Sequence, residues 1–281
     1  MVRIIDQYDE ISISRLSSAL PWGVQVPNDP TQTIYVWFEA LTNYVTAAGW
    51  NTDDKKFNDY WNSKTIQICG PDNLRFQGHI WQSLLLSAGI KNTTKLLVHG
   101  TVLDKDGKKI SKSVGNVIDP VEELNKFGID PIRYYILSGL NTYSDCSWNP
   151  DDLKLKWNSL ANNWGNLVSR VLHLSDIIGT ENSDGSELET DIDRICKESE
   201  SLWNDYEIKL AINKTDEAVS HLNKWVNDNK PWEKKDPKEI GVLYKLISKI
   251  NKLYEPVIPN TTKHIEEGIK LKKKIIAITK I

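Results

Sequence analysis

The chain has 281 residues, of which 40% are hydrophobic and 26% charged, and its formal net charge is −3 at pH 7. This length suffices for one large or two medium domains with an ordinary globular composition. No run approaches the roughly 18 consecutive apolar residues of a membrane helix, so no membrane partner is expected. The net charge also excludes polyanion binding through bulk positive charge, so any nucleic-acid contact must come from locally placed basic and aromatic side chains.

The chain has three cysteines, Cys69, Cys146 and Cys196, which lie far apart and show no Cys-x-x-Cys or Cys/His spacing. We therefore expect neither a disulfide framework nor a bound zinc ion. Free thiols of this kind behave as small core hydrophobes in a reducing compartment. Residues 1–10 carry acids and no apolar run, which is typical of neither a signal peptide nor a transit peptide.

Short apolar runs separated by turns fill the first half of the chain. Three of them predict strands, at residues 33–38, 65–69 and 95–99. Between the last two, apolar residues recur at helical spacing over residues 74–88. Strand, helix and strand in this order predict a parallel β-α-β unit.

A hairpin is predicted next, over residues 101–111, because two short extended arms flank the strong turn signal Asp106-Gly107. Asp119-Pro120 then predicts the start of a helix, since proline is tolerated in the first helical turn.

In the second half of the chain the strand signals fade and helical periodicity takes over. An acidic loop near residues 180–187 and the segment Lys230-Pro231-Trp232 interrupt this pattern. We therefore place a domain boundary near residues 140–150, with an α/β domain over 1–145 and an all-α bundle over 146–281. The expected helices of the bundle span residues 151–178, 191–229, 237–253 and 261–276.

A lysine-rich loop at residues 109–113 (Lys-Ile-Ser-Lys-Ser) follows the predicted hairpin turn. Lysines are mobile point charges that could hold a polyphosphate while its α-phosphate is attacked. The alternative is a solvated basic turn without a ligand.

Four separated motifs carry a resemblance to the methionyl-tRNA synthetases, a family of class I aminoacyl-tRNA synthetases, over nearly the whole chain. The motifs are residues 35–40 (Tyr-Val-Trp-Phe-Glu-Ala), Gly70-Pro71-Asp72 with the following helix, residues 109–120, and residues 165–170 (Gly-Asn-Leu-Val-Ser-Arg) followed by Lys230-Pro231-Trp232. The resemblance implies the C-terminal half of a Rossmann-type catalytic domain followed by an anticodon-binding bundle. It also implies ATP-dependent activation of methionine and its transfer to tRNA(Met).

The resemblance assigns the chemistry of activation to the loop and to the end of one strand. The implied catalytic residues are Lys109, Ser111 and Lys112. The implied ATP-binding residues are Gly70, Asp72, Val102 and Lys112, with Mg²⁺ arriving on the nucleotide. Asp72 follows a predicted strand, where ligands of open α/β sheets bind, although an aspartate there could equally be a helix N-cap. Ile110 stands where the family usually has methionine, and we expect little effect from this change.

The methionine pocket is implied to be largely aromatic, and an apolar, polarizable lining suits a thioether. The implied pocket residues are Trp37, Ala40, Tyr44, Gln77 and Trp81. An aromatic stripe could instead be core. Gln77 is the chief departure, because the family often has histidine there; Ile80 replaces an aromatic residue and Gln82 a proline. Gln77 could still offer a donor to sulfur, and discrimination against amino acids of similar size stays open.

The predicted bundle carries the argument for RNA binding. Asn162, Asn166 and Arg170 are spaced i, i+4 and i+8, which predicts one stripe along a helix. Asparagine is unfavourable within helices, whereas amide and guanidinium groups can read exposed base edges, and Trp232 could stack on a base. By resemblance these four residues read the CAU anticodon. Alternatively, the asparagines pair inside the bundle and Trp232 fills the core.

Class I synthetases also need a His-x-Gly-His signature. None of the five histidines of the chain lies in such a motif; they are His79, His99, His173, His221 and His264. We therefore expect the chain to match roughly the C-terminal half of a synthetase and to show little or no aminoacylation alone, with the N-terminal half as a partner.

Two other functions stay open. The chain could be a non-catalytic anticodon-binding fragment or paralogue, or a ligase for leucine, valine, isoleucine or cysteine, for which Gln77 leaves room. Residues 21–27 (Pro-Trp-Gly-Val-Gln-Val-Pro) and the lack of metal-binding cysteines resemble the mitochondrial and bacterial-like branch of the family. We therefore expect a location in the mitochondrial matrix, with the cytoplasm as the alternative.

Overall fold

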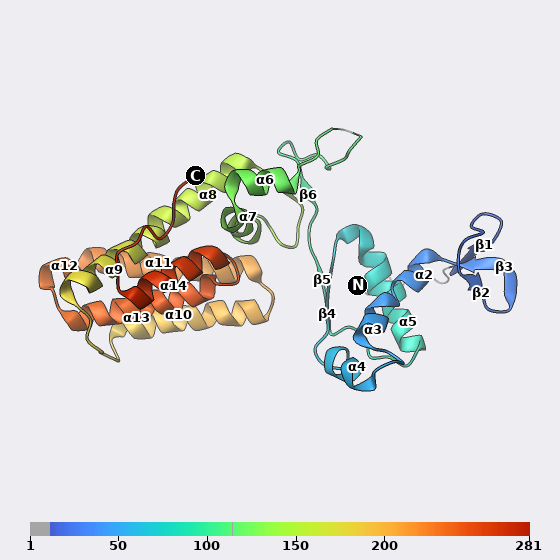
Figure 1. Cartoon of the computed structure of the whole chain (residues 1–281), viewed down its shortest axis with the longest axis horizontal. Coiled ribbons are helices and arrows are strands. Elements are labelled where there is room, and N and C mark those ends of the chain that lie inside the picture. Colours follow the sequence, from blue (N-terminus) through green and yellow to red (C-terminus); the bar gives the residue numbers. More distant parts are fainter. Residues whose placement is uncertain (1–11, 114) are drawn as a thin grey trace. The chain divides into compact units, whose positions relative to one another are not determined.

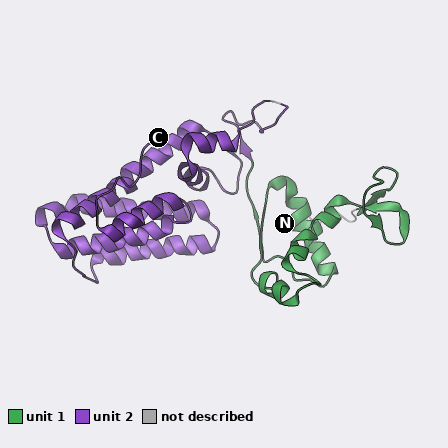
Figure 2. Cartoon of the chain, viewed as in Figure 1, with its two compact units in different colours: residues 1–101 green, residues 102–281 purple. Residues whose placement is uncertain are grey.

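The computed structural model describes residues 12–113 and 115–281, and the chain divides into two compact units (Figure 2). Unit 1 is Met1–Thr101 and unit 2 is Val102–Ile281. The predicted domains 1–145 and 146–281, with a boundary near residues 140–150, stay a prediction. Within the described residues, no helix has both the length and the apolar character needed to cross a membrane.

An antiparallel sheet of order β1-β3-β2 opens the described part of unit 1 (Figure 1). Its strands are β1 (Ser14–Leu16), β2 (Gln25–Val26) and β3 (Asp29–Ile34). The strand predicted over residues 33–38 is wrong in its second half, because helix α2 (Val36–Ala40) follows β3. Trp37 of α2 stacks on Phe76 with ring centroids 4.5 Å apart. This tertiary contact outweighs the β propensity of the segment.

A parallel β-α-β unit lies in the second part of unit 1, as predicted. Strands β4 (Ile66–Cys69) and β5 (Lys95–Val98) pair in parallel, with Ile66 opposite Lys95 and Cys69 opposite Val98. The connection runs through the 3-10 turn η1 (Pro71–Asn73), the π-helical turn η2 (Phe76–Ile80) and helix α5 (Trp81–Ser87). Helices α3 (Asn43–Ala48) and α4 (Asp54–Tyr60) precede β4. The core includes the edge-to-face pair Trp61 and Trp81, with ring centroids 6.1 Å apart.

Unit 2 begins with the predicted hairpin. The Asp104 N–H donates to the Lys108 carbonyl at 2.8 Å, and Leu103 and Lys109 form an antiparallel bridge. Strand β6 (Val102–Leu103) also pairs in parallel with β7 (Cys146–Ser147), a strand that no sequence pattern indicated.

The helix predicted at Asp119-Pro120 is confirmed as α6 (Pro120–Phe127), because Asp119 Oδ1 accepts the Val121 N–H at 2.7 Å as an N-cap. Helix α7 (Ile129–Tyr134) and the π-helical turn η3 (Tyr135–Gly139) follow it.

The remainder of unit 2 is the predicted helical bundle, whose long helices pack along one another (Figure 1). Its elements are α8 (Pro150–Leu160), the π-helical turn η4 (Ala161–Gly165), α9 (Asn166–Ile178), α10 (Glu187–Asn204), α11 (Ile208–Asn229), α12 (Pro231–Lys234), α13 (Pro237–Tyr254) and α14 (Pro259–Leu271). The single helix predicted over 191–229 is wrong: Tyr206 takes a φ of 67° and turns the chain between α10 and α11. The apolar pattern continues on both sides of the turn, so periodicity did not reveal it.

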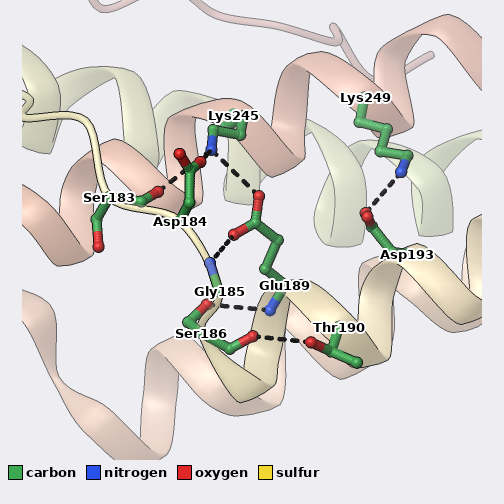
Figure 3. A network of polar contacts seen from close by, with 9 residues as sticks. All are labelled: Ser183, Asp184, Gly185, Ser186, Glu189, Thr190, Asp193, Lys245 and Lys249. Carbon is green, nitrogen blue, oxygen red and sulfur yellow. Dashed lines mark hydrogen bonds and ion pairs between the residues drawn. The ribbon is translucent and has the colours of Figure 1, made fainter.

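Two lysines of α13 tie the start of α10 into the bundle (Figure 3). Lys245 Nζ donates to the Ser183 carbonyl at 3.2 Å and pairs with Asp184 and Glu189, and Lys249 Nζ lies 2.6 Å from Asp193 Oδ1. The loop that precedes α10 also crosses α13 closely, since a Cβ on Gly241 would lie 1.9 Å from the Glu181 carbonyl oxygen.

Candidate functional site

The lysine loop in unit 2 is organised by Asn116 and Asp104. The Asn116 side chain accepts the Ser111 N–H at 2.9 Å and donates to the Lys109 carbonyl at 3.1 Å and to Asp104 Oδ2 at 2.7 Å. Asp104 Oδ1 in turn accepts the Asp106 and Lys108 N–H groups at 3.0 and 2.8 Å. One amide and one carboxylate therefore join the hairpin turn to the loop.

The predicted catalytic side chains of this loop are accessible. Lys109 and Lys112 are exposed, Ser111 is half-buried, and the Ser111 and Ser113 hydroxyls lie 2.8 Å apart. Hydrogen bonds from Asn116 and from the backbone N–H of Lys108 lower the pKa of Asp104, so this carboxyl stays ionised and keeps accepting them. The loop thus has a hydrogen-bonded backbone and exposed lysine side chains, as a polyphosphate clamp requires.

Asn116 and Asp104 were not predicted as site residues. Asn116 lies within the quoted motif at residues 109–120, and Asp104 lies two residues before Asp106-Gly107. Short polar side chains beside a turn commonly bond to nearby backbone, which was the available signal.

The predicted ATP-binding residues lie in both units. Gly70 and Asp72 follow β4 in unit 1, at the carboxyl end of a parallel strand, whereas Val102 and Lys112 belong to unit 2. The Asp72 carboxylate lies against Gly70, since a Cβ on Gly70 would be 2.8 Å from Asp72 Oδ1. Asp72 is not the N-cap of η1, because Gly70 holds that position. The assembly of these residues into one ATP site stays a prediction.

The predicted methionine-pocket residues lie in unit 1. Tyr44 and Trp81 have ring centroids 6.0 Å apart, and Gln77 Nε2 donates to the Tyr44 hydroxyl at 3.0 Å. Trp37 and the half-buried Ala40 lie on α2. The Trp37 ring stacks on Phe76 of η2, the turn that also contains Gln77. The structure therefore joins Tyr44, Gln77 and Trp81 directly.

The predicted pocket residues differ in how much of each side chain is exposed, and this limits which of them a ligand could touch. Tyr44 is 39% exposed, whereas Trp81 is 2% exposed and belongs to the core of unit 1. Trp81 can therefore only back a ligand that Tyr44 touches. Gln67, the polar residue within the apolar run at 65–69, bonds to Gln77 and was not predicted as part of the site.

The predicted anticodon residues lie on the surface of the bundle. Asn162 and Asn166 are exposed, which contradicts the alternative that they pair inside it. Asn162 lies within the π-helical turn η4 and Asn166 is the first residue of α9, so their spacing does not correspond to one regular α-helical turn.

Arg170 and Trp232 lie together. The Arg170 guanidinium carbon lies 5.9 Å from the Trp232 ring centroid, and Arg170 Nη1 donates to Asn227 Oδ1 at 2.9 Å. Trp232 is 38% exposed, so it does not fill the core. A cation held over an accessible indole offers a stacking surface and hydrogen-bond donors for an unpaired base. Asn227, at the end of α11, joins the two predicted residues, and no sequence signal pointed to it. We call Arg170, Asn227 and Trp232 the predicted anticodon cluster.

The family profile described as tRNA synthetases class I (M) matches residues 4–172. The chain therefore belongs to this family of class I tRNA synthetases. The predicted fold class is confirmed, since an α/β part with Rossmann-type topology precedes a helical bundle.

The curated relatives are methionine–tRNA ligases. The protein of Fusobacterium nucleatum is 32% identical over 284 residues, covering 95% of this chain and 44% of the relative. That of Caldanaerobacter subterraneus is 34% identical, covering 93% and 43%. Mycobacterium tuberculosis methionyl-tRNA synthetase in complex with methionyl-adenylate superposes with a TM-score of 0.82 at 29% identity, covering 95% of this chain and 56% of that one. The chain thus spans less than half the length of these curated relatives.

Proposed function

We propose that the chain is part of a methionine–tRNA ligase, which activates methionine with ATP and transfers it to tRNA(Met). The observation that carries the proposal is the ordered lysine loop, in which Asn116 and Asp104 fix the backbone while Lys109 and Lys112 stay exposed. The methionine–tRNA ligases that match 93–95% of the chain support the same function.

In this proposal, Lys109 and Lys112 hold the phosphates of ATP as pyrophosphate leaves the α-phosphate, and Lys112 stabilises the charge of the transition state. The Ser111 hydroxyl adds a hydrogen bond to the phosphates. Gly70, Asp72 and Val102 bind the nucleoside. Mg²⁺ would arrive on the phosphates of ATP.

Methionine would lie against Tyr44 and Trp81, with Trp37, Ala40 and Gln77 around it. The CAU anticodon would be read by Asn162, Asn166 and the anticodon cluster. The location in the mitochondrial matrix, or else the cytoplasm, belongs to this proposal as well.

The N-terminal half of a synthetase is proposed as the partner for catalysis. The sequence contains no His-x-Gly-His, and β4 and β5 form a two-stranded parallel pair, whereas parallel sheets are normally larger and covered on both faces. Ile68 of β4 is 70% exposed, which is consistent with a surface that a further segment covers.

Complementation tests the ligase. The chain alone should show little or no methionine-dependent ATP–pyrophosphate exchange. Fusion to the part of the Fusobacterium nucleatum methionine–tRNA ligase that this chain does not cover should produce exchange. In the fusion, Lys112→Ala should lower the rate by roughly 100-fold, since a donor to the developing charge is lost. Lys105→Ala, on the exposed turn of the same hairpin, is the matched control.

Exchange by the chain alone at the rate of a full-length synthetase would contradict the need for a partner. A folded fusion without any exchange would contradict the ligase itself. In that case the second candidate, a non-catalytic anticodon-binding protein, would remain, and it is favoured by the location of the whole anticodon cluster in unit 2.

A further inference from the structure

Three glutamine side chains form a hydrogen-bonded row that ends at the Tyr44 hydroxyl. Gln67 lies on β4, Gln77 in η2 and Gln82 on α5. Gln82 Nε2 donates to Gln67 Oε1 at 3.3 Å, Gln67 Nε2 donates to Gln77 Oε1 at 3.0 Å, and Gln77 Nε2 donates to the Tyr44 hydroxyl oxygen at 3.0 Å. Gln67 and Gln77 are each 7% exposed, so the middle of the row is shielded from water.

The row has a fixed polarity. The Thr93 backbone N–H donates to Gln82 Oε1 at 3.1 Å, and a backbone N–H cannot accept. The Asn92 side-chain amide donates to the same oxygen at 3.0 Å. Because each glutamine amide has one donor end and one acceptor end, fixing Gln82 orients Gln67, which then orients Gln77. The Thr93 hydroxyl reinforces this order by donating to Gln67 Oε1 at 2.6 Å.

The polarity determines what the Tyr44 hydroxyl can do. A phenol oxygen that accepts from Gln77 keeps its own O–H free to donate to another group. Tyr44 is the accessible end of the row and lies beside the buried Trp81. Apolar side chains of similar volume at positions 67 and 82 would fill the same space but would leave the hydroxyl free to rotate.

We propose that Gln67 and Gln82 are positioning residues that, through Gln77, hold the Tyr44 hydroxyl as a hydrogen-bond donor to the side chain of the bound amino acid. This inference rests on the proposed function and concerns its selectivity. A thioether sulfur accepts a weak hydrogen bond, whereas a methylene group does not. The row therefore favours methionine over norleucine, which has nearly the same shape with a methylene in place of sulfur.

The test measures the binding of L-methionine and L-norleucine to the full chain by tryptophan fluorescence, and repeats it on the fusion described above. The wild-type chain should bind methionine roughly threefold to tenfold more tightly than norleucine, as expected for one hydrogen bond. Gln67→Met, which is nearly isosteric and breaks the row, should remove this preference by weakening methionine binding alone. Gln25→Met, on the exposed strand β2, is the matched control.

Tyr44→Phe provides a second variant that leaves the buried row in place, and it should lose the preference to the same extent. A structural defect would weaken both ligands equally, because they fill the same space. A preference for methionine that survives in Gln67→Met or Tyr44→Phe would contradict the proposed role of the row in selectivity. An equal loss of affinity for methionine and norleucine would contradict it as well. If neither the wild-type chain nor the fusion binds either amino acid, this result would contradict the proposed function and, with it, the role of the row.

Discussion

Replacement of Asp216 by leucine is expected to lower the free energy of unfolding by about 3 kcal/mol. Asp216, on α11, accepts hydrogen bonds from two tyrosines of the bundle. The Tyr134 hydroxyl lies 3.1 Å from its Oδ2, and the Tyr254 hydroxyl donates to its Oδ1. Tyr254 is fully buried and Tyr134 is 3% exposed, so leucine would leave two buried hydroxyls without their acceptor. Urea denaturation followed by circular dichroism measures the change.

Asp228→Leu is the matched control, because Asp228 lies on the same helix and is exposed. Its midpoint should stay close to that of the wild type. An Asp216→Leu chain that unfolds at the wild-type urea concentration would contradict the role of the carboxylate as the shared acceptor.

The same cluster gives stability a defined pH dependence. Burial raises the pKa of Asp216, while hydrogen bonds from Tyr254 and Tyr134 and the charge of Lys156 oppose the rise. The folded state then holds the proton more tightly than the unfolded state. The stabilisation that protonated Asp216 contributes to the folded state is fully present below the ordinary aspartate pKa of about 4. This stabilisation is lost as the pH rises through the folded-state pKa of Asp216. In Asp216→Asn this part of the pH dependence should disappear.

Replacement of Trp232 by alanine is expected to weaken binding of a tRNA(Met) anticodon stem-loop by about tenfold or more, since stacking of one base contributes roughly 1–3 kcal/mol. The indole is accessible, and Arg170 is held above it by Asn227. Removing the ring takes away both the stacking surface and the partner of the guanidinium. Fluorescence anisotropy of a labelled stem-loop measures the loss.

Trp22→Ala is the control for tryptophan removal, because Trp22 is 83% exposed and lies in unit 1. It should bind the stem-loop like the wild type. Equal affinities for wild type and Trp232→Ala would mean that the indole does not contact the RNA.

Short-range patterns predicted much of the fold. The β-α-β unit, the Asp106-Gly107 hairpin and the helix capped by Asp119 depend on residues close in the sequence, and the structure confirms them. The failures occurred where a single residue or a distant contact decides the outcome. A positive φ at Tyr206 splits one expected helix, and stacking of Trp37 on Phe76 converts half of an expected strand into a helix.

The candidate sites show the same limit. The motifs predicted Arg170 and Trp232 as parts of one anticodon site, but they did not predict Asn227, which bonds to Arg170 and lies 57 residues from it. Gln77 was recognised as a departure from the family pattern, whereas its partner Gln67 lies on a strand ten residues away. Such contacts depend on the tertiary fold, which periodicity and local motifs do not describe.

The decisive measurement is the anticodon specificity of the unmodified chain. Anisotropy titrations would compare a tRNA(Met) anticodon stem-loop carrying CAU with one carrying CAC, at one salt concentration. We expect tighter binding of CAU by about tenfold, because a single base change loses its hydrogen bonds to the reading side chains. Equal binding of the two stem-loops by a folded chain would contradict it.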